Sequence, residues 1–347
     1  MKKTLAALIV TAFAASAANA AVVYDNEGTK VELNGSLRLI MEKADKKVYN
    51  AANQSTKKAN SALRNAGSRF GITVKHNLDN DFYALGRLEF RFDDTTSRDK
   101  FGRLYAKRAY VGLGSKATGD ITFGRQLTIA DDLSQAVDYE YGFIPKSEYI
   151  PTAGTGVVRY DYKGIEGLQL SANYNFGQTN DEKGNPLKPG IKNAYAVGAL
   201  YTVGDLDARL AYGHTNFETG ASYAHRLDGV LASLGYKFGD FTLTGDFGYG
   251  HEKLDDAKVN KFYVSPGFAY QVTPASQVYG NYLYERAKGE SDKVKTHGFL
   301  LGADYKLHKQ VVLFVEGKYV TAKKYTNDAY DGKVKDRAIG VGMRVFF

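Results

Sequence analysis

Apolar and polar residues alternate along most of this chain, a pattern typical of strands whose two faces meet different surroundings. The segment 168–176 is the clearest case: its even positions hold Leu, Leu, Ala, Tyr and Phe, and its odd positions hold Gln, Ser, Asn and Asn. In 31–41 the odd positions are apolar or small and the even positions are mostly polar. Further segments with this period are 82–92, 230–238, 241–249, 311–319 and 339–347. The pattern predicts an all-β protein.

The links between these segments are of two kinds, and the two kinds alternate along the chain. Short links lie near 78–81, 114–119, 163–167, 203–206, 239–240, 272–275 and 308–310. Long, polar links lie near 43–67, 93–103, 126–155, 177–192, 214–227, 251–260, 286–297 and 321–336. A soluble sandwich also has alternating strands, but this exchange of tight turns and long loops is typical of strands that cross a bilayer up and down.

Seven short and eight long links join about 16 strands, so we predict a transmembrane antiparallel up-and-down β-barrel. An even number of strands lets the first, about 29–42, pair with the last, about 337–347, and close the ring. A barrel of this size encloses an aqueous channel rather than a packed core.

Composition fits a membrane barrel better than its mean hydropathy of −0.37 suggests. Lipid-facing and lumen-facing residues cancel in any window average, which hides the membrane character of a barrel. The 26 Tyr and 19 Phe suit a chain of many strands with aromatic girdles. The chain has no Cys, so a closed hydrogen-bonded barrel, rather than disulfides, is expected to supply its stability. The net charge of +8 is scattered rather than clustered, which argues against a nucleic-acid partner.

The first residues have the features of a secretory signal. Lys2 and Lys3 precede the apolar stretch 5–17, and Ala18-Asn19-Ala20 is an A-x-A cleavage site. The stretch is shorter than the roughly 20 residues that a membrane-spanning helix needs. We therefore expect a signal peptide at 1–20 and one barrel domain at 21–347, exported to the periplasm and inserted in the outer membrane.

Phase along the strands predicts which arginines face the channel. Each of them is out of phase with apolar neighbours, and an arginine that faced lipid at mid-bilayer would cost roughly 2–4 kcal/mol. The residues are Arg38, Arg69, Arg87, Arg91 and Arg159. Snorkelling at strand ends is the alternative for each.

Neither a catalytic nor a metal site is indicated. No serine lies in a G-x-S-x-G setting, and four of the six histidines fall in or beside the long links. The pairs Asp93-Asp94, Asp131-Asp132 and Asp255-Asp256 lack calcium-loop spacing and are interpreted as solvated. The charge runs Lys57-Lys58, Asp181-Glu182-Lys183 and Lys323-Lys324 are interpreted as solvated or lipopolysaccharide-contacting surface. No cofactor is expected.

Several short segments together resemble the general porins of Gram-negative outer membranes, most of all those of the Haemophilus and Pasteurella group. They are Ala21-Val22-Val23-Tyr24-Asp25, Gly28-Thr29-Lys30-Val31-Glu32-Leu33-Asn34-Gly35, Gly67-Ser68-Arg69-Phe70-Gly71, Arg108-Ala109-Tyr110-Val111-Gly112-Leu113, Phe123-Gly124-Arg125-Gln126 and the terminal Phe347.

The resemblance implies a homotrimer of 16-stranded barrels whose third long loop folds inward, with acidic loop residues opposing basic wall residues. The implied loop acids are Asp131, Asp132, Asp138 and Glu140, with Asp138 and Glu140 favoured. Arg108 stands at a wall-arginine position, whereas the first-strand wall cation falls at Ser36, one inward step before Arg38. Phe347 would be the signal read by the barrel-assembly machinery.

The function expected from these observations is a water-filled outer-membrane porin for passive diffusion of small hydrophilic solutes and ions. The several lumen arginines favour anions weakly. A solute-specific channel is the main alternative, and a barrel enzyme or an adhesin is less favoured. The expected partners are two further copies of the chain, outer-membrane lipid and lipopolysaccharide, the assembly machinery and the permeating solutes.

Overall fold

The computed structural model describes residues 20–93, 101–218 and 225–347, so the predicted signal peptide lies outside the described residues except for Ala20. No helix in these ranges is long and apolar enough to cross a membrane. The described elements are β1 (Ala21–Asn26), β2 (Thr29–Tyr49), β3 (Ser55–Asn65), β4 (Arg69–Asn77), β5 (Phe82–Phe92), β6 (Leu104–Ser115), β7 (Gly119–Leu127), the 3₁₀-helices η1 (Ile129–Asp132) and η2 (Lys146–Glu148), β8 (Ala153–Ile165), β9 (Leu168–Asn175), β10 (Gln178–Asn180), β11 (Pro186–Val203), β12 (Leu206–Phe217), β13 (His225–Phe238), β14 (Phe241–Leu254), β15 (Ala257–Thr273), β16 (Ser276–Lys288), β17 (Asp292–His308), β18 (Val311–Thr326) and β19 (Ala329–Phe346).

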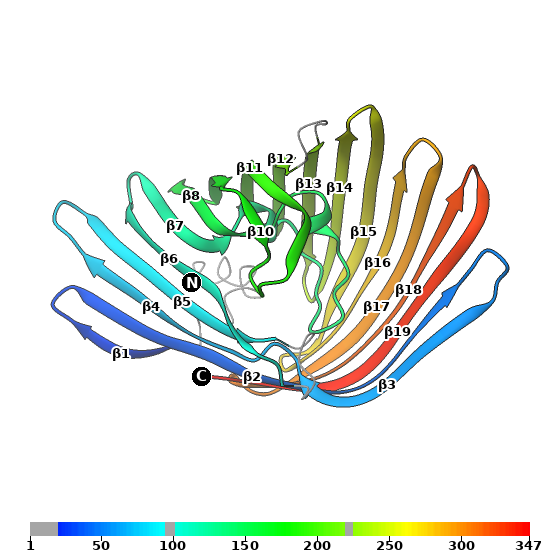
Figure 1. Cartoon of the computed structure of the whole chain (residues 1–347). Coiled ribbons are helices and arrows are strands. Elements are labelled where there is room, and N and C mark those ends of the chain that lie inside the picture. Colours follow the sequence, from blue (N-terminus) through cyan, green and yellow to red (C-terminus); the bar gives the residue numbers. More distant parts are fainter. Residues whose placement is uncertain (1–19, 94–100, 219–224) are drawn as a thin grey trace.

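These strands form one closed antiparallel barrel (Figure 1). β3 and β4 pair with the upper and lower halves of β2, so together they make one spanning strand. β1 and β10 only extend hairpins with β2 and β11. Leaving these aside, 16 strands close the ring, and β19 pairs with β2 from Phe346↔Ser36 to Lys333↔Tyr49. The predicted fold class and the pairing of first and last strands are confirmed.

Four of the predicted long loops are wrong, because their residues continue the strands. The segments 43–67, 251–260, 286–297 and 321–336 are mostly paired strand and end in tight hairpins that flare out at the right of Figure 1. Outside a membrane, backbone pairing needs no apolar stripe, so charged residues can continue a strand. Asn327 and Asp328, with φ of 50° and 62°, close one such hairpin in two residues.

The wall has an apolar outer face and a polar inner face. Outward side chains such as Leu37, Met41 and Val341 are more than half exposed, whereas the inward Glu316 is fully buried. Tyr236 and Phe238 mark the turn end of the outward stripe on β13, where amphipathic rings suit the headgroup level. The buried residues therefore lie inside the ring, where the segment between β7 and β8 packs against the wall.

Candidate functional site

The long loop between β7 and β8 crosses the lumen instead of leaving the barrel (Figure 1). Its base is closed by the Thr128 N–H, which donates to the Thr152 carbonyl at 3.0 Å. The side chains of its two ends pack against Leu231, Tyr263 and Leu283 on β13, β15 and β16. Its middle packs in a second cluster on β16 to β19 and β2. The loop therefore covers one side of the lumen and leaves the inner face of β4 to β7 opposite.

Inward-facing glycines make room for the loop on the wall beneath it. A Cβ at Gly213 would lie 2.6 Å from the Ile150 side chain, and one at Gly229 would lie 2.2 Å from the Tyr149 carbonyl oxygen. These approaches are closer than any side chain tolerates, so glycine is required where the loop meets β12 and β13. The two glycines thus form a trough in the wall, in which the loop lies.

A buried carboxylate on β18 holds the middle of the loop. Glu316 is 0% exposed and accepts the backbone N–H groups of Tyr139, Glu140 and Tyr141 at 2.7, 2.8 and 2.5 Å. The Tyr279 hydroxyl also donates to it, at 2.9 Å. Charge-assisted hydrogen bonds are about twice as strong as neutral ones, so this contact fixes three consecutive loop residues to the wall.

A second buried carboxylate holds the loop nearer its start. Asp246 on β14 accepts the Ser134 hydroxyl at 2.7 Å and the Gln135 N–H at 3.2 Å. Arg209 on β12 donates to the Asp132 carbonyl at 2.8 Å and pairs with Asp207 at 2.8 Å. An acidic and a basic side chain of the wall thus hold this part of the loop through its neutral hydroxyl and backbone groups.

Glu140, one of the two favoured loop acids, is engaged in an ion-pair network with the wall. Arg64 on β3 contacts the Glu140 carboxylate at 2.6 Å and the Glu42 carboxylate at 2.8 Å. The Tyr141 hydroxyl donates to Glu42 at 2.9 Å. The Glu140 side chain is only 9% exposed, so its charge is balanced by Arg64.

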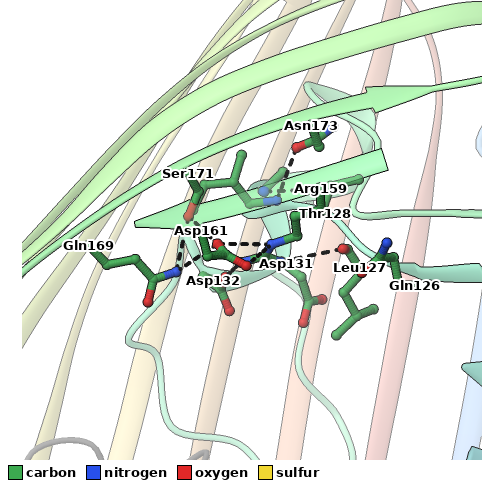
Figure 2. A network of polar contacts seen from close by, with 12 residues as sticks. Gln126, Leu127, Thr128, Asp131, Asp132, Arg159, Asp161, Gln169, Ser171 and Asn173 are labelled. Atoms are coloured by element: carbon green, nitrogen blue, oxygen red, sulfur yellow. Dashed lines mark hydrogen bonds and ion pairs between the residues drawn. The ribbon is translucent and has the colours of Figure 1, made fainter. Parts of the chain in front are cut away.

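Asp132 and Arg159 form a similar ion pair, which joins the start of the loop to β8 (Figure 2). The Arg159 guanidinium lies between Asp132, at 2.9 Å, and Asp161, at 2.9 Å. Ser171 and Gln169 donate to Asp161 from β9. The sequence interpretation of Asp132 as a solvated residue is wrong, because its carboxylate binds the Arg159 side chain.

Asp138 is the predicted acid whose carboxylate remains open to the lumen. The residue is exposed, and within the described ranges its carboxylate makes no hydrogen bond or ion pair. It lies against Gly142, where a Cβ would approach it to 2.6 Å. Asp131 is half-buried, and its carboxylate likewise has no partner within these ranges. Of the four predicted acids, these two have carboxylates without a cationic partner.

The opposite wall carries a row of arginines on adjacent strands. Arg38 lies directly across from Arg344, which donates to the Tyr139 carbonyl of the loop, and Arg69 lies directly across from Arg91. Arg69 also lies across from Ser36, whose hydroxyl accepts the Arg38 Nε at 2.7 Å. Like charges that face each other across a strand pair repel, so the row creates a strongly positive surface.

One carboxylate neutralises part of this wall. Glu89, 3% exposed, contacts Arg87 at 2.9 Å, Arg91 at 2.6 Å and Arg108 at 3.5 Å. Arg38 makes no ion pair within the described residues. The six arginines predicted from the sequence all point inward, and five of them share this wall while Arg159 holds the loop.

The hairpin formed by β10 and β11, at the end of the barrel that carries the long loops, also contacts the inner wall. Lys107, inserted by a β-bulge in β6, pairs with Glu182. Lys183 contacts Asp93 at 2.8 Å, and Asp93 is 4% exposed. Arg125 donates to the Glu182 carbonyl at 3.0 Å. The prediction that Asp93, Glu182 and Lys183 are solvated is wrong, because the hairpin folds back onto the wall.

Sequence reasoning missed several inward residues, although the same phase rule finds most of them. Arg344, Glu316 and Asp246 occupy polar positions of segments already recognised as alternating. The prediction from phase covers selected arginines and leaves these residues out. It also omits Arg64, because 43–67 is predicted as a long loop whereas Arg64 lies on β3.

Comparisons with known proteins agree with this architecture. Residues 4–325 match a family model described as Gram-negative porin. A major outer membrane protein of Pasteurella multocida strain Pm70 is 30% identical over 377 residues, covering all of both chains. The fold is similar to that of outer-membrane expressed OmpT of Vibrio cholerae, with a TM-score of 0.70 and 17% identity over 94% of this chain and 100% of that one. It is also similar to an anion-selective porin from Comamonas acidovorans, with a TM-score of 0.64 and 18% identity over 92% of this chain and 100% of that one.

Proposed function

Because the chain belongs to the Gram-negative porin family and is an outer-membrane channel, we propose that solutes pass between its inward loop and the arginine wall of β2 and β4 to β6. The observation that carries this proposal is the position of the loop. It is fixed to β8 and β11 to β19 by buried carboxylates and glycine contacts, and to β2 and β3 through Glu42 and Arg64, which leaves the arginines of β4 to β6 on the opposite side. Permeation is passive, since small hydrophilic solutes need only a hydrated path.

In this proposal Asp138 is the acid that faces the arginines across the path. Glu140 and Asp132 instead hold the loop through Arg64 and Arg159. Opposed charges in a low-dielectric wall focus the electric field, which orients dipolar solutes and disfavours apolar ones. Arginines outnumber unpaired acids on the path, so the channel prefers anions.

The outer surface supports assembly into a homotrimer. Among described residues, the exposed large side chains of β19, β2, β4 and β6 are aliphatic, for example Ile339, Met41 and Val111. Exposed tyrosines lie on β8, β9, β11 to β15, β17 and β18. A barrel face in lipid carries aromatic girdles. In the sector from β19 to β6 the exposed ring among these wall strands is Phe82 on β5, so this tyrosine-poor sector is the one that copies of the chain cover.

Export and assembly complete the proposal. Residues 1–20 act as the signal peptide, and the barrel begins at Ala21. The C-terminal Phe347 is the aromatic read during assembly, and its backbone already closes the ring by bonding Gly35 in both directions at 2.8 and 3.1 Å.

The test is reconstitution of the exported protein in a planar bilayer. Stepwise conductance in groups of three increments is expected for an open trimer. A correctly folded, heat-modifiable protein that gives no conductance would overturn the proposal. Concentration-dependent block by one particular solute would indicate a solute-specific channel instead.

A further inference from the structure

The pair of β19 with β2 closes the ring of the barrel, and we call this pair the seam. The two strands lie side by side in Figure 1, as the red and the blue ribbon. Arg337 and Asp45 are direct neighbours in the seam and lie 292 residues apart in the chain. The other pairs of the ring join strands that follow one another closely in the chain. Because the entropy lost on bringing two segments together rises with the length of chain between them, the seam is the costliest pair to form.

Three residues of the inward loop, 139–141, are bound to the strands on one side of the seam. Glu316 on β18 accepts their three backbone N–H groups at 2.7, 2.8 and 2.5 Å. Arg344 on β19 donates to the Tyr139 carbonyl, and its guanidinium carbon lies 4.6 Å from the centroid of the Tyr139 ring. That ring stacks on Phe314 of β18, with the two centroids 4.7 Å apart. Charged hydrogen bonds and ring contacts thus hold the segment to the last two strands of the barrel.

The same segment is bound to the strands on the other side of the seam. The Tyr141 hydroxyl donates to Glu42 on β2 at 2.9 Å. The Glu140 carboxylate contacts Arg64 on β3 at 2.6 Å. Arg64 in turn donates to both carboxylate oxygens of Glu42, each at 2.8 Å. Consecutive loop residues therefore connect β18 and β19 with β2 and β3 on the inner face of the barrel.

The Tyr141 side chain lies on the seam itself. Glu42, which accepts its hydroxyl, is the direct neighbour of Gly340 on β19. A Cβ at Gly340 would lie 2.6 Å from the Tyr141 hydroxyl oxygen and 2.5 Å from the Ile40 side chain. Packed atoms do not approach one another so closely, so glycine at this position leaves the space that the hydroxyl occupies.

Apolar side chains from both sides of the seam are buried together under the loop. Ile40 on β2 belongs to the same buried cluster as Phe314 on β18 and Ala338 on β19. The loop residues Tyr139 and Tyr141 pack in this cluster. A barrel of this size holds water in its lumen, so opening the seam would expose these side chains to water. Their burial therefore favours the closed ring.

We propose that the segment 139–141 clamps the seam, so that the inward loop holds the first and last strands of the barrel together and helps the ring to close. Once the segment binds Glu42 and Arg64, its N–H groups stand where β18 must arrive. The last strands then dock on a partner that is already beside β2, which raises their effective concentration there. This function concerns the assembly and stability of the ring, and it goes beyond the effect of the loop on the path for solutes.

Hydrogen–deuterium exchange in the folded protein tests the clamp. Tyr141→Phe keeps the ring and removes the hydrogen bond to Glu42, and a double variant with Glu140→Gln also removes the charge that Arg64 binds. Amides of the seam, in 36–49 and 333–346, should exchange a few times faster in the single variant and at least tenfold faster in the double variant. Amides of β14 and β15 should exchange as in the wild type.

The two substitutions lie in the loop, so the seam peptides have the wild-type sequence in every protein and their exchange rates compare directly. Tyr141→Phe is conservative and provides the test on its own where the double variant does not assemble. Unchanged exchange at the seam, or the same acceleration in β14 and β15, would overturn the proposal.

A matched control removes a loop contact with a strand outside the seam. The Ser134 hydroxyl donates to Asp246 on β14 at 2.7 Å. Ser134→Ala therefore removes one hydroxyl-to-carboxylate hydrogen bond, as Tyr141→Phe does. Exchange at the seam should stay as in the wild type. If Ser134→Ala accelerates it as much as Tyr141→Phe, any loosening of the loop has this effect and the clamp is wrong.

Refolding measures the contribution of the segment to closure. The chain 21–347 is diluted from urea into detergent micelles, and the heat-modifiable fraction is followed in time. We expect the double variant to refold several-fold more slowly than the wild type, and Ser134→Ala to refold at the wild-type rate. Equal rates for all of these proteins would contradict a role in closing the ring.

Oligomeric state and conductance are measured separately from the clamp. The outward face of the seam lies in the sector given to the trimer, so exchange is compared at equal oligomeric state, measured by native mass spectrometry on the same samples. Faster seam exchange only in samples that have lost the trimer would assign the effect to subunit contacts and overturn the proposal. Neither exchange nor refolding depends on conductance, so absence of conductance in every protein would contradict the proposed path and leave the clamp result intact.

Discussion

The Tyr141 backbone N–H donates to the buried Glu316 carboxylate at 2.5 Å, joining the inward loop to β18 across 175 residues of sequence. Two adjacent N–H groups of the loop share the same acceptor. This side chain therefore fixes the middle of the loop in the lumen, and with it the width of the proposed path at that point.

Replacing Glu316 by Gln is expected to loosen the loop. The amide keeps one acceptor oxygen but turns an NH₂ toward loop N–H donors, so at least one donor loses its partner at a cost of about 1–3 kcal/mol. We expect a lower unfolding temperature and larger, noisier single-channel currents. Glu27→Gln, at the exposed β1–β2 turn, is the control. Current traces and stability like the wild type's would contradict the role given to Glu316.

Gly229→Ala tests the trough beneath the loop. The new Cβ would lie 2.2 Å from the Tyr149 carbonyl oxygen, so the loop must move, at a cost of about 1–3 kcal/mol. A changed conductance and reduced thermal stability are expected. At Gly245 a Cβ meets nothing within 4 Å, so Gly245→Ala should change neither. If Gly229→Ala and Gly245→Ala have the same conductance and thermal stability, the contact between Gly229 and Tyr149 does not position the loop.

Asp138 and Glu140 should behave differently when neutralised. Asp138→Asn removes an open lumen charge, so the reversal potential in a salt gradient should shift toward anions while stability changes by less than about 0.5 kcal/mol. Glu140→Gln removes a partner of Arg64, so stability should fall by about 1–3 kcal/mol. If Glu140→Gln shifts the reversal potential and Asp138→Asn does not, Asp138 is not the acid that faces the path.

Arg38→Gln and Arg69→Gln should lower the preference for chloride over potassium, and the double variant should lower it further. Because each change relieves repulsion within a row of like charges, thermal stability should be kept or raised. Arg226→Gln, on an exposed outward position of β13, is the control. If the ratio of chloride to potassium permeability is unchanged in the double variant, Arg38 and Arg69 do not line the path that solutes take.

Gly35→Ala tests the closure of the barrel by its C-terminus. A Cβ there would lie 2.5 Å from the Phe347 ring and 2.8 Å from the Arg69 carbonyl oxygen. The heat-modifiable fraction in outer membranes is expected to fall several-fold. At Gly317 the nearest atom is 3.5 Å away, so Gly317→Ala should assemble normally. Normal assembly of Gly35→Ala would show that the terminal ring can move without consequence.

The alternating strands, the ring they close and the inward face of the six predicted arginines follow from the sequence alone. Those properties follow from a period of two, which is local and which lipid enforces on every spanning strand. The same rule placed Arg38 and Arg69 inward before any contact was known. It failed at 43–67 and 321–336, because strands outside the membrane lose the apolar stripe while keeping their backbone pairing.

Which charges neutralise one another depends on the tertiary structure. Glu140 and Asp138 are two residues apart and look equivalent in sequence, yet Arg64 from β3 reaches the first and leaves the second open to the lumen. Strand register likewise brings Lys47 on β2 beside Lys335 on β19, which no pattern along the chain indicates. Electrostatic partners are set by distances of a few ångströms between residues far apart in the chain, and a one-dimensional pattern carries no such distances.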